Sequence, residues 1–281
     1  MSIDIDILKT FLEVNRTRHF GKAADNLFLT QSSVSARIKL LEEDVGNPVF
    51  TRKRNDIQLT PAGQKILRYA ESIVNTWSHA RQEVAIEDEN TTPLAVAGMP
   101  SLWDIALQDW LHHCYKNCGN LMLSVDIAGA DTMPRRLLDG TLDLAFMYDP
   151  PQFDELEHIK IITIPLELIS STRETSFESA LTHNYVLVDW GTSFANSHAR
   201  HFDDTPTPSM RTSHGRIAMN YILNCGGAAY LPRQMVQARL ESGELYTFDD
   251  APIINRVAYA VYPSRSNKIE EITNTLNYFS S

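Results

Sequence analysis

The hydrophobic pattern of this 281-residue chain changes its period near Pro93. Before this point, apolar residues recur at spacings of three and four, which places them along one face of a helix. After it, short apolar runs alternate with helical stretches, which is typical of a largely parallel sheet. A chain of this length is sufficient for two or three compact units. We therefore expect an α/β protein overall, with a mainly α N-terminal part and a C-terminal α/β part.

Three short helices are predicted within residues 1–46. Their apolar stripes are formed by Ile7, Leu8, Phe11 and Leu12, by Ala23, Ala24 and Leu27, and by Val34, Ile38, Leu41 and Val45. Thr30 is a suitable N-cap for the third helix, because its hydroxyl can accept a hydrogen bond from a free backbone N–H. The opposite face of that helix is polar and then cationic, and is formed by Gln31, Ser32, Ser35 and Lys39, flanked by Ser33 and Arg37. Such a face suits close approach to a polar groove.

Two strand-like runs follow between residues 49 and 60, on either side of an Arg-Lys-Arg-Asn-Asp sequence. This pattern predicts a β-hairpin, or wing, with a basic tip that contains Arg52, Lys53 and Arg54. The formal net charge of the chain is −10, but residues 1–87 carry 12 Lys and Arg against 11 Asp and Glu, whereas residues 88–281 carry 13 against 24. Because phosphate binding depends on local charge, this acidity does not exclude a nucleic acid as partner.

A long helix is predicted to begin at Pro61, with Thr60 as its cap. Its apolar residues recur at spacings of 4, 3, 4, 3 and 4, and are Ile66, Ala70, Ile73, Trp77, Ala80 and Val84. This is the pattern of a coiled-coil seam, which needs a partner helix. Packing within the chain is an alternative, but the pattern favours a homodimer. We therefore expect a DNA-binding domain over 1–60 and a dimerising linker helix and hinge over 61–92.

The remaining residues, 93–281, are predicted to form one bilobed α/β domain. Strands are expected near 94–97, 122–128, 142–146, 159–171, 185–189, 228–231 and 257–262, and helices near 101–116, 131–138, 193–202, 213–223, 232–241 and 267–279. Two of the strand-rich segments are long enough to cross between lobes. We expect lobe I to span about 93–164 and 263–281, and lobe II about 165–262.

Several classes of protein are disfavoured by what the sequence lacks. The N-terminal segment places charges among its apolar residues, and no later stretch approaches 18 uncharged apolar residues. We therefore expect a cytoplasmic protein with no membrane partner. The sequence contains no G-x-S-x-G, G-x-x-x-x-G-K or H-E-x-x-H motif, so we predict no enzyme, no catalytic residue and no cofactor.

The cysteines give no strong signal for a metal or a disulfide. Cys114, Cys118 and Cys225 are too few for a disulfide framework. His112, His113, Cys114 and Cys118 lie close in sequence, but no Cys-x-x-Cys is present, so the favoured interpretation is helix residues partly buried against a sheet, with no metal. Oxidation of cysteine or methionine stays open as a regulatory signal.

Specific sequence segments resemble the LysR family of transcriptional regulators. The match is specific in the runs 11–14, 19–24, 29–35, 38–42, 50–52 and 59–63, and weaker at 139–145 and 226–232. A narrower resemblance, carried by 16–21, 50–55 and 101–103, is to the subgroup that contains the flagellar-operon regulator HdfR. Ser33, where the family often has alanine, and Pro48 depart from the usual pattern. These departures concern operator preference and not DNA binding itself.

The resemblance implies a winged helix-turn-helix that binds double-stranded DNA with inverted half-sites. It also implies a homodimer, usually paired into a homotetramer, with RNA polymerase as a further candidate partner. In this scheme Gln31, Ser32, Ser35 and Lys39 reach base edges or nearby phosphates. Thr30, Arg37, Arg52, Lys53 and Arg54 mainly hold the DNA backbone, and Ser33 belongs to the same surface.

The resemblance further implies a periplasmic-binding-protein-like pair of lobes with a small effector between them. The expected effector-binding residues are Pro100, Ser101, Trp103, Ala128, Gly129, Met147, Tyr148, Gly191, Thr192 and Thr212. Ser101 is the strongest candidate, because it begins a helix with free N–H groups, although a plain N-cap role stays open. Trp103 and Met147 are also typical core residues. The main alternative function is a solute-binding protein without catalytic activity, which would leave residues 1–87 without a role.

Overall fold

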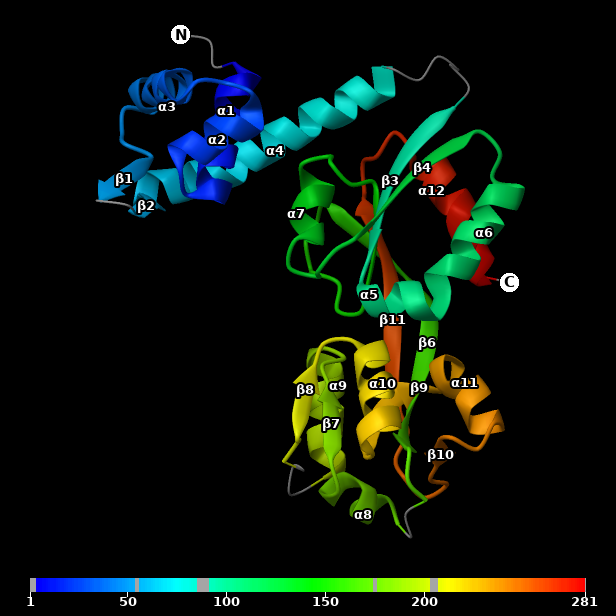
Figure 1. The fold of residues 1–281 in the computed structure, drawn as a ribbon. Coiled ribbons are helices and arrows are strands. Elements are labelled where there is room, and N and C mark those ends of the chain that lie inside the picture. The colour runs from blue at the N-terminus through cyan, green and yellow to red at the C-terminus, as the bar shows by residue number, and fades with distance from the viewer. Residues whose placement is uncertain (1–3, 54–55, 85–90, 174–175, 203–206, 281) are drawn as a thin grey trace. The chain divides into compact units, whose positions relative to one another are not determined.

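The computed structural model describes residues 4–53, 56–84, 91–173, 176–202 and 207–280. The chain divides into two compact units, one formed by Met1–Asp88 with Asp139–Thr141 and the other by Glu89–Leu138 with Leu142–Ser281. The N-terminal unit contains α1 (Ile5–Thr17), α2 (Phe20–Leu27), α3 (Gln31–Val45), β1 (Phe50–Lys53), β2 (Asp56–Leu59) and α4 (Pro61–Val84) (Figure 1). The predicted order of three helices, a two-stranded wing and a long helix is confirmed.

Local sequence signals fix where these helices begin. The Asp4 side chain caps α1, His19 Nδ1 accepts from two backbone N–H groups at the start of α2, and Thr30 Oγ1 accepts from the Ser33 N–H at 3.1 Å. Each cap satisfies N–H groups that the helix itself leaves free. Gly63 lies in the first turn of α4, where a Cβ atom would overlap the carbonyl oxygen of Val49. The close approach of α4 to the backbone just before β1 therefore requires glycine.

The core of the N-terminal unit is formed by the predicted apolar stripes. Phe11, Val34, Ile38 and Leu41 have no exposed surface. The ring of Phe11 also packs against Phe50 of β1, with centroids 5.2 Å apart. The helix-turn-helix is thus held on the wing by aromatic as well as aliphatic contacts.

The C-terminal unit has the predicted α/β architecture. Its strands are β3 (Thr92–Gly98), β4 (Leu121–Ile127), β5 (Leu144–Met147), β6 (Leu156–Ser170), β7 (Tyr185–Val188), β8 (Met210–Thr212), β9 (Ala228–Pro232), β10 (Tyr246–Thr247) and β11 (Ile254–Pro263). Its helices are α5 (Pro100–Leu102), the π-helical η1 (Trp103–Leu107), α6 (Gln108–Asn117), α7 (Met133–Leu138), α8 (Phe177–Thr182), α9 (Thr192–His201), α10 (Gly215–Cys225), α11 (Arg233–Glu241), α12 (Ile269–Leu276) and the 3-10 helix η2 (Asn277–Ser280).

Two long antiparallel strands, β6 and β11, connect two lobes of this unit (Figure 1). The strand order is β4-β3-β5-β11-β6-β9-β7-β8, and β10 pairs with β6. We call the part built on β3, β4 and β5 lobe I and the part built on β7, β8 and β9 lobe II. In both lobes the short strands run parallel to their short-strand neighbours, so their carboxyl ends lie at one edge.

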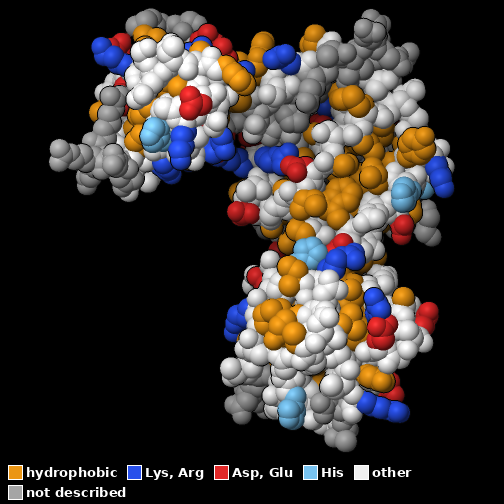
Figure 2. All heavy atoms as spheres, viewed as in Figure 1, with side chains coloured by type: hydrophobic (Ala, Val, Ile, Leu, Met, Phe, Trp, Pro, Cys, Tyr) orange, Lys and Arg blue, Asp and Glu red, His pale blue; other side chains and the backbone are white. Residues whose placement is uncertain are grey.

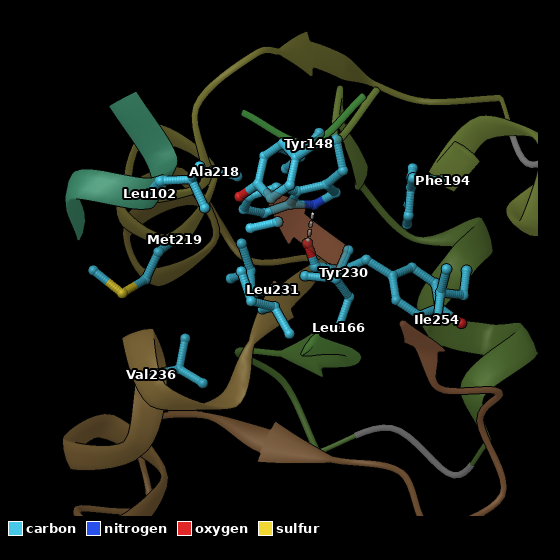
Figure 3. Close-up of a cluster of buried hydrophobic side chains, with 14 of the residues drawn as sticks. Leu102, Tyr148, Leu166, Phe194, Ala218, Met219, Tyr230, Leu231, Val236 and Ile254 are labelled. Atoms are coloured by element: carbon cyan, nitrogen blue, oxygen red, sulfur yellow. Dashed lines mark hydrogen bonds between the residues drawn. The ribbon is translucent and has the colours of Figure 1, made fainter. Parts of the chain in front are cut away.

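The lobe II core continues to the crossing strands through one large aromatic residue. Trp190 is 1% exposed, and its indole Nε1 donates to the carbonyl oxygen of Tyr230 at 2.9 Å. Figure 3 shows Tyr148, Leu166, Tyr230 and Ile254 in the same cluster. Because Tyr148 follows β5 of lobe I, this cluster joins residues of both lobes at the crossing strands.

Candidate DNA-binding surface and effector site

The N-terminal end of α3 presents polar side chains to solvent. Gln31, Ser32 and Lys39 are exposed, whereas Ser33 and Ser35 are half-buried. The exposed Thr30 is a cap, and its hydroxyl also contacts the hydroxyls of Ser32 and Ser33 at 2.9 and 2.8 Å. The surface predicted from sequence is therefore present, with Gln31 and Ser32 as its most accessible groups at the start of the helix.

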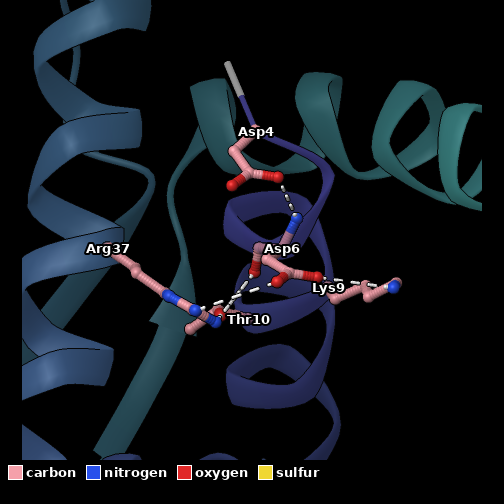
Figure 4. A network of polar contacts seen from close by, with 5 residues as sticks. All are labelled: Asp4, Asp6, Lys9, Thr10 and Arg37. Carbon is pink, nitrogen blue, oxygen red and sulfur yellow. Dashed lines mark hydrogen bonds and ion pairs between the residues drawn. The ribbon is translucent and has the colours of Figure 1, made fainter.

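Arg37 makes contacts within the protein that the sequence did not predict. Its guanidinium donates to Thr10 Oγ1 at 3.2 Å and to the Asp6 carbonyl oxygen at 3.5 Å, and lies 3.9 Å from the Asp6 carboxylate (Figure 4). Asp6 also contacts Lys9 at 3.4 Å. Arg37 therefore connects α3 to α1 and is only partly available to DNA.

The turn between α2 and α3 carries an exposed aromatic residue. Phe28 is 96% exposed and has a φ angle of 55°, in the left-handed region. The ring of Phe28 is therefore not part of the core of the N-terminal unit. The left-handed backbone turns its side chain outward, while Leu29 is half-buried against the core.

The wing has the predicted hairpin geometry. Strands β1 and β2 are antiparallel, with Phe50 opposite Leu59 and Arg52 opposite Ile57. Arg52 and Lys53 are in β1, whereas Arg54 lies outside the described residues.

The seam of α4 divides into a covered half and an open half. Ala70 is fully buried and Ile66 packs against the core of the same unit. Ile73 and Trp77 are each 48% exposed, Val84 is 87% exposed, and Ala80 is half-buried. The second half of α4 therefore presents an apolar stripe that is about half exposed at Ile73 and Trp77 and largely exposed at Val84.

Ser101 lies in a buried hydrogen bond. Its Oγ is 2.9 Å from the hydroxyl of Tyr148, and the two residues are 4% and 3% exposed. The N-cap of α5 is Met99, so Ser101 does not cap the helix as the simpler interpretation proposed. Burial raises the pKa of Tyr148 to about 12, so this hydroxyl is neutral near pH 7.

Arg256, on the crossing strand β11, is a charged residue of this site that the sequence did not reveal. Its side chain is 3% exposed and pairs with the Asp149 carboxylate at 3.1 Å. Its guanidinium also lies 4.8 Å from the centre of the Tyr148 ring. Its Nε is buried without a hydrogen-bond partner among the described residues. Such an atom carries an energetic cost that a bound acceptor would remove.

Gly191 of lobe II lies against the Asp149–Arg256 pair. Its φ angle is +89°, and a Cβ atom there would lie 2.6 Å from Asp149 Oδ2 and 2.9 Å from Arg256 Nη2. Only glycine fits this conformation and this approach without displacement. The structure thus brings together Ser101, Tyr148 and Gly191 of the predicted set, and adds Asp149 and Arg256.

A second polar link joins the lobes beside α10. Asp104, in η1, accepts from Arg216 Nη2 at 2.8 Å and Nε at 3.2 Å, and its other oxygen lies 3.6 Å from His214 Nε2. Figure 2 shows histidine and cationic side chains at the junction of the two lobes. Asp104 belongs to a π-helical segment, which is common at functional sites.

The other predicted effector residues are less central. Met147 is fully buried in the core of lobe I, and the Trp103 indole donates to the Asp126 carbonyl oxygen at 3.1 Å. The Thr212 hydroxyl accepts from the His214 N–H at 3.2 Å. Pro100 and Ala128 are half-buried, and Gly129 and Thr192 are exposed.

The cysteines form no metal site in the described part of the chain. No group of three or more His, Cys, Asp or Glu side chains with the geometry of a metal site is found there. Cys114 is buried, and burial raises the pKa of its thiol to about 12. Within the described residues, no helix is both apolar enough and long enough to cross a bilayer.

Comparison with protein families gives two matches that cover most of the chain. Residues 5–64 match the bacterial regulatory helix-turn-helix protein model of the lysR family, and residues 87–278 match the LysR substrate binding domain. The chain belongs to the LysR family. It is a DNA-binding transcriptional regulator with a ligand-binding domain, as the sequence predicted.

Individual LysR proteins are similar over nearly the whole length. The transcriptional regulator HdfR of Yersinia enterocolitica is 37% identical over 275 residues, which cover 95% of this chain and 92% of that protein. HdfR of Yersinia pestis is 36% identical over the same length. The predicted resemblance to the HdfR-like subgroup is therefore confirmed.

Solved LysR structures have the same fold. CbnR has a TM-score of 0.79 at 16% identity, with 99% of this chain and 100% of that chain covered. CbnR in complex with its target DNA has a TM-score of 0.76 at 17% identity, again with 99% and 100% covered.

Proposed function

We propose that this LysR regulator reads an operator with inverted half-sites through the N-terminal end of α3. The observation that carries the proposal is the exposed polar surface formed by Gln31, Ser32 and Lys39 on a helix that buries Val34, Ile38 and Leu41 on its other face. Gln31 supplies an amide that can bond to a base edge in two places. Ser35, which has a shorter side chain, makes a further contact to the DNA. The wing residues Arg52, Lys53 and Arg54 bind phosphates.

Arg37 has a different role in this proposal. Its bonds to Thr10 and to Asp6 fix the angle of α3 on α1, so it positions the reading helix and makes at most one phosphate contact. Loss of Arg37 would then weaken binding to all DNA sequences without changing base preference.

Two copies of the chain pair through α4. Ile73, Trp77 and Val84 form the open half of its seam, and such a stripe is stable in water only when another apolar surface covers it. Pairing of two α4 helices places two α3 helices on one DNA site, which explains a half-site arrangement. A tetramer and contact with RNA polymerase are further predictions from the family resemblance.

The effector binds at the junction of the lobes, beside Arg256. Ser101, Tyr148 and Gly191 come from three separated segments and meet there around a buried cation, whose Nε has no hydrogen-bond partner in the described part of the chain. An effector with a carbonyl or carboxylate oxygen would complete this bond, and closure of the lobes around it would change how the subunits hold DNA. A redox signal through cysteine or methionine is the alternative input.

The test is capture of fragmented genomic DNA by the purified full-length protein at near-physiological salt, followed by sequencing. Enrichment of a few sites with two inverted half-sites would support operator reading. Gln31→Ala should change the preferred base at one position of each half-site, whereas Gln64→Ala, an exposed glutamine in the first turn of α4, should not. Enrichment that is independent of sequence, or identical for both variants, would contradict the assignment of α3.

A further inference from the structure

A pocket of about 610 Å3 lies within lobe II, between α9 and the edge strand β8. The Tyr185 hydroxyl bonds to His198 Nε2 at 2.9 Å, which holds α9 on one face of the sheet. Leu187 shares that face with Tyr185 because side chains alternate along a strand. Arg211 of β8 is paired with Leu187 in the parallel register and so lies on the same face.

The pocket has the character of a small-molecule site. Its apolar surface is formed by Leu187 and by one side of α9, where Phe194, Ala195 and Ala199 lie. The two alanines leave the space that larger side chains would fill. Figure 2 shows hydrophobic side chains gathered over α9 and β8. Both the volume and the few polar groups are typical of sites that bind small organic molecules.

One cation stands unpaired at this pocket. The Arg211 guanidinium is exposed, and within the described ranges it has no hydrogen bond or ion pair. The nearby Asp189 carboxylate instead accepts from the Gly191 N–H at 2.9 Å. Arginine is well suited to a carboxylate, with which it forms two parallel hydrogen bonds.

We propose that this pocket of lobe II binds a small monocarboxylate with an aromatic or branched apolar body. The carboxylate pairs with Arg211, and the apolar body lies against Leu187, Ala195 and Ala199. Thr212, one of the effector-binding residues predicted from the sequence, lines this pocket, but Ser101, Tyr148 and Arg256 do not, so the site is separate from the one beside Arg256. The proposal therefore does not depend on the effector site at the lobe junction.

Ligand-observed saturation-transfer NMR on the full-length protein tests it, with 3-phenylpropionate as the probe and the neutral 3-phenylpropionamide as its matched control. We expect saturation of the phenyl protons of the acid and at least fivefold weaker binding of the amide. Arg211→Gln should weaken binding of the acid by about fivefold or more. Arg200→Gln removes a neighbouring exposed cation of α9 that does not line the pocket and should leave the dissociation constant unchanged.

A second variant tests the pocket through its volume and does not change its charge. Ala199→Trp fills the pocket and should abolish the phenyl signal, while the circular dichroism spectrum confirms that the variant is folded. Equal binding of acid and amide would overturn the proposal. So would binding that survives both Arg211→Gln and Ala199→Trp, because the probe would then be held elsewhere, including beside Arg256.

Discussion

Replacement of Gly191 by alanine is the most direct test of how the two lobes meet. The new Cβ would lie 2.6 Å from Asp149 Oδ2 and 2.9 Å from Arg256 Nη2, so one of them must move. Arg256 is 3% exposed and enclosed, whereas Asp149 is 47% exposed, so the Asp149 carboxylate moves into water. The buried guanidinium then loses its partner.

The expected loss has two parts. A non-glycine residue at φ +89° costs about 1–3 kcal/mol of backbone strain. Loss of the partner of a buried charge costs about 3–5 kcal/mol when both groups are enclosed, and we reduce this to about 1–3 kcal/mol because half of Asp149 is in water. The free energy of unfolding of the C-terminal unit should therefore fall by about 2–6 kcal/mol.

Gly243→Ala is the matched control. Its φ angle is +73° and a Cβ there meets nothing within 4 Å, so only backbone strain is added. Urea unfolding of both full-length variants, followed by tryptophan fluorescence, measures the difference. If Gly191→Ala were no more destabilising than Gly243→Ala, the contact of Gly191 with the Asp149–Arg256 pair would have no energetic importance, and our account of the lobe junction would be wrong.

Three further perturbations test other parts of the molecule. Phe28→Asn should stabilise the N-terminal unit by about 0.5–1 kcal/mol, because asparagine tolerates the left-handed backbone at this position. Loss of the ring costs little, since it is 96% exposed. Unchanged or lower stability in thermal unfolding would count against this prediction. Trp77→Asp should lower the dimer fraction in analytical ultracentrifugation, whereas Gln64→Ala should not, and an unaltered dimer would remove α4 as the main interface. Burial lowers the pKa of His198, so the unfolded chain binds a proton at higher pH than the folded one does. The free energy of unfolding should therefore fall as the pH drops below about 6.5, and it should fall less steeply in His198→Gln. Equal slopes of stability against pH for the two proteins would refute the role of this histidine.

The sequence was sufficient to predict those features of the fold that depend on a single local signal. Thr30 at the start of α3 and Pro61 at the start of α4 both act within a single turn of helix, and both boundaries were predicted. The apolar spacing in α3 also identified its buried face, and hence the polar face opposite. Short elements such as β8, β10 and α8 were missed, because a segment of so few residues is too short to show a hydrophobic period.

The site at the lobe junction could be predicted only in part, because its contacts join distant residues. Arg256 touches Asp149 across 107 positions of the chain, and nothing in the neighbourhood of Arg256 distinguishes it from an exposed strand residue. Ser101 was found from its place after a strand, but its bond to Tyr148 required the fold. Arg37 was assigned to the DNA backbone from the family resemblance and from its place beside the polar face of α3, although tertiary packing gives it partners on α1.

The polar groups of the lobe junction differ in what they offer an effector. Ser101 and Tyr148 share one hydrogen bond, and the hydroxyl that accepts it still has its own O–H to offer a ligand. A neutral hydrogen bond of this kind adds only a small net free energy. Such groups discriminate between ligands by geometry more than they add affinity. Two buried atoms have no hydrogen bond to any residue that the structure describes: Arg256 Nε, and the Asp104 oxygen that faces His214 at 3.6 Å. A ligand that reaches Arg256 therefore removes a cost already present in the protein, and we expect most of the affinity for an effector to come from there.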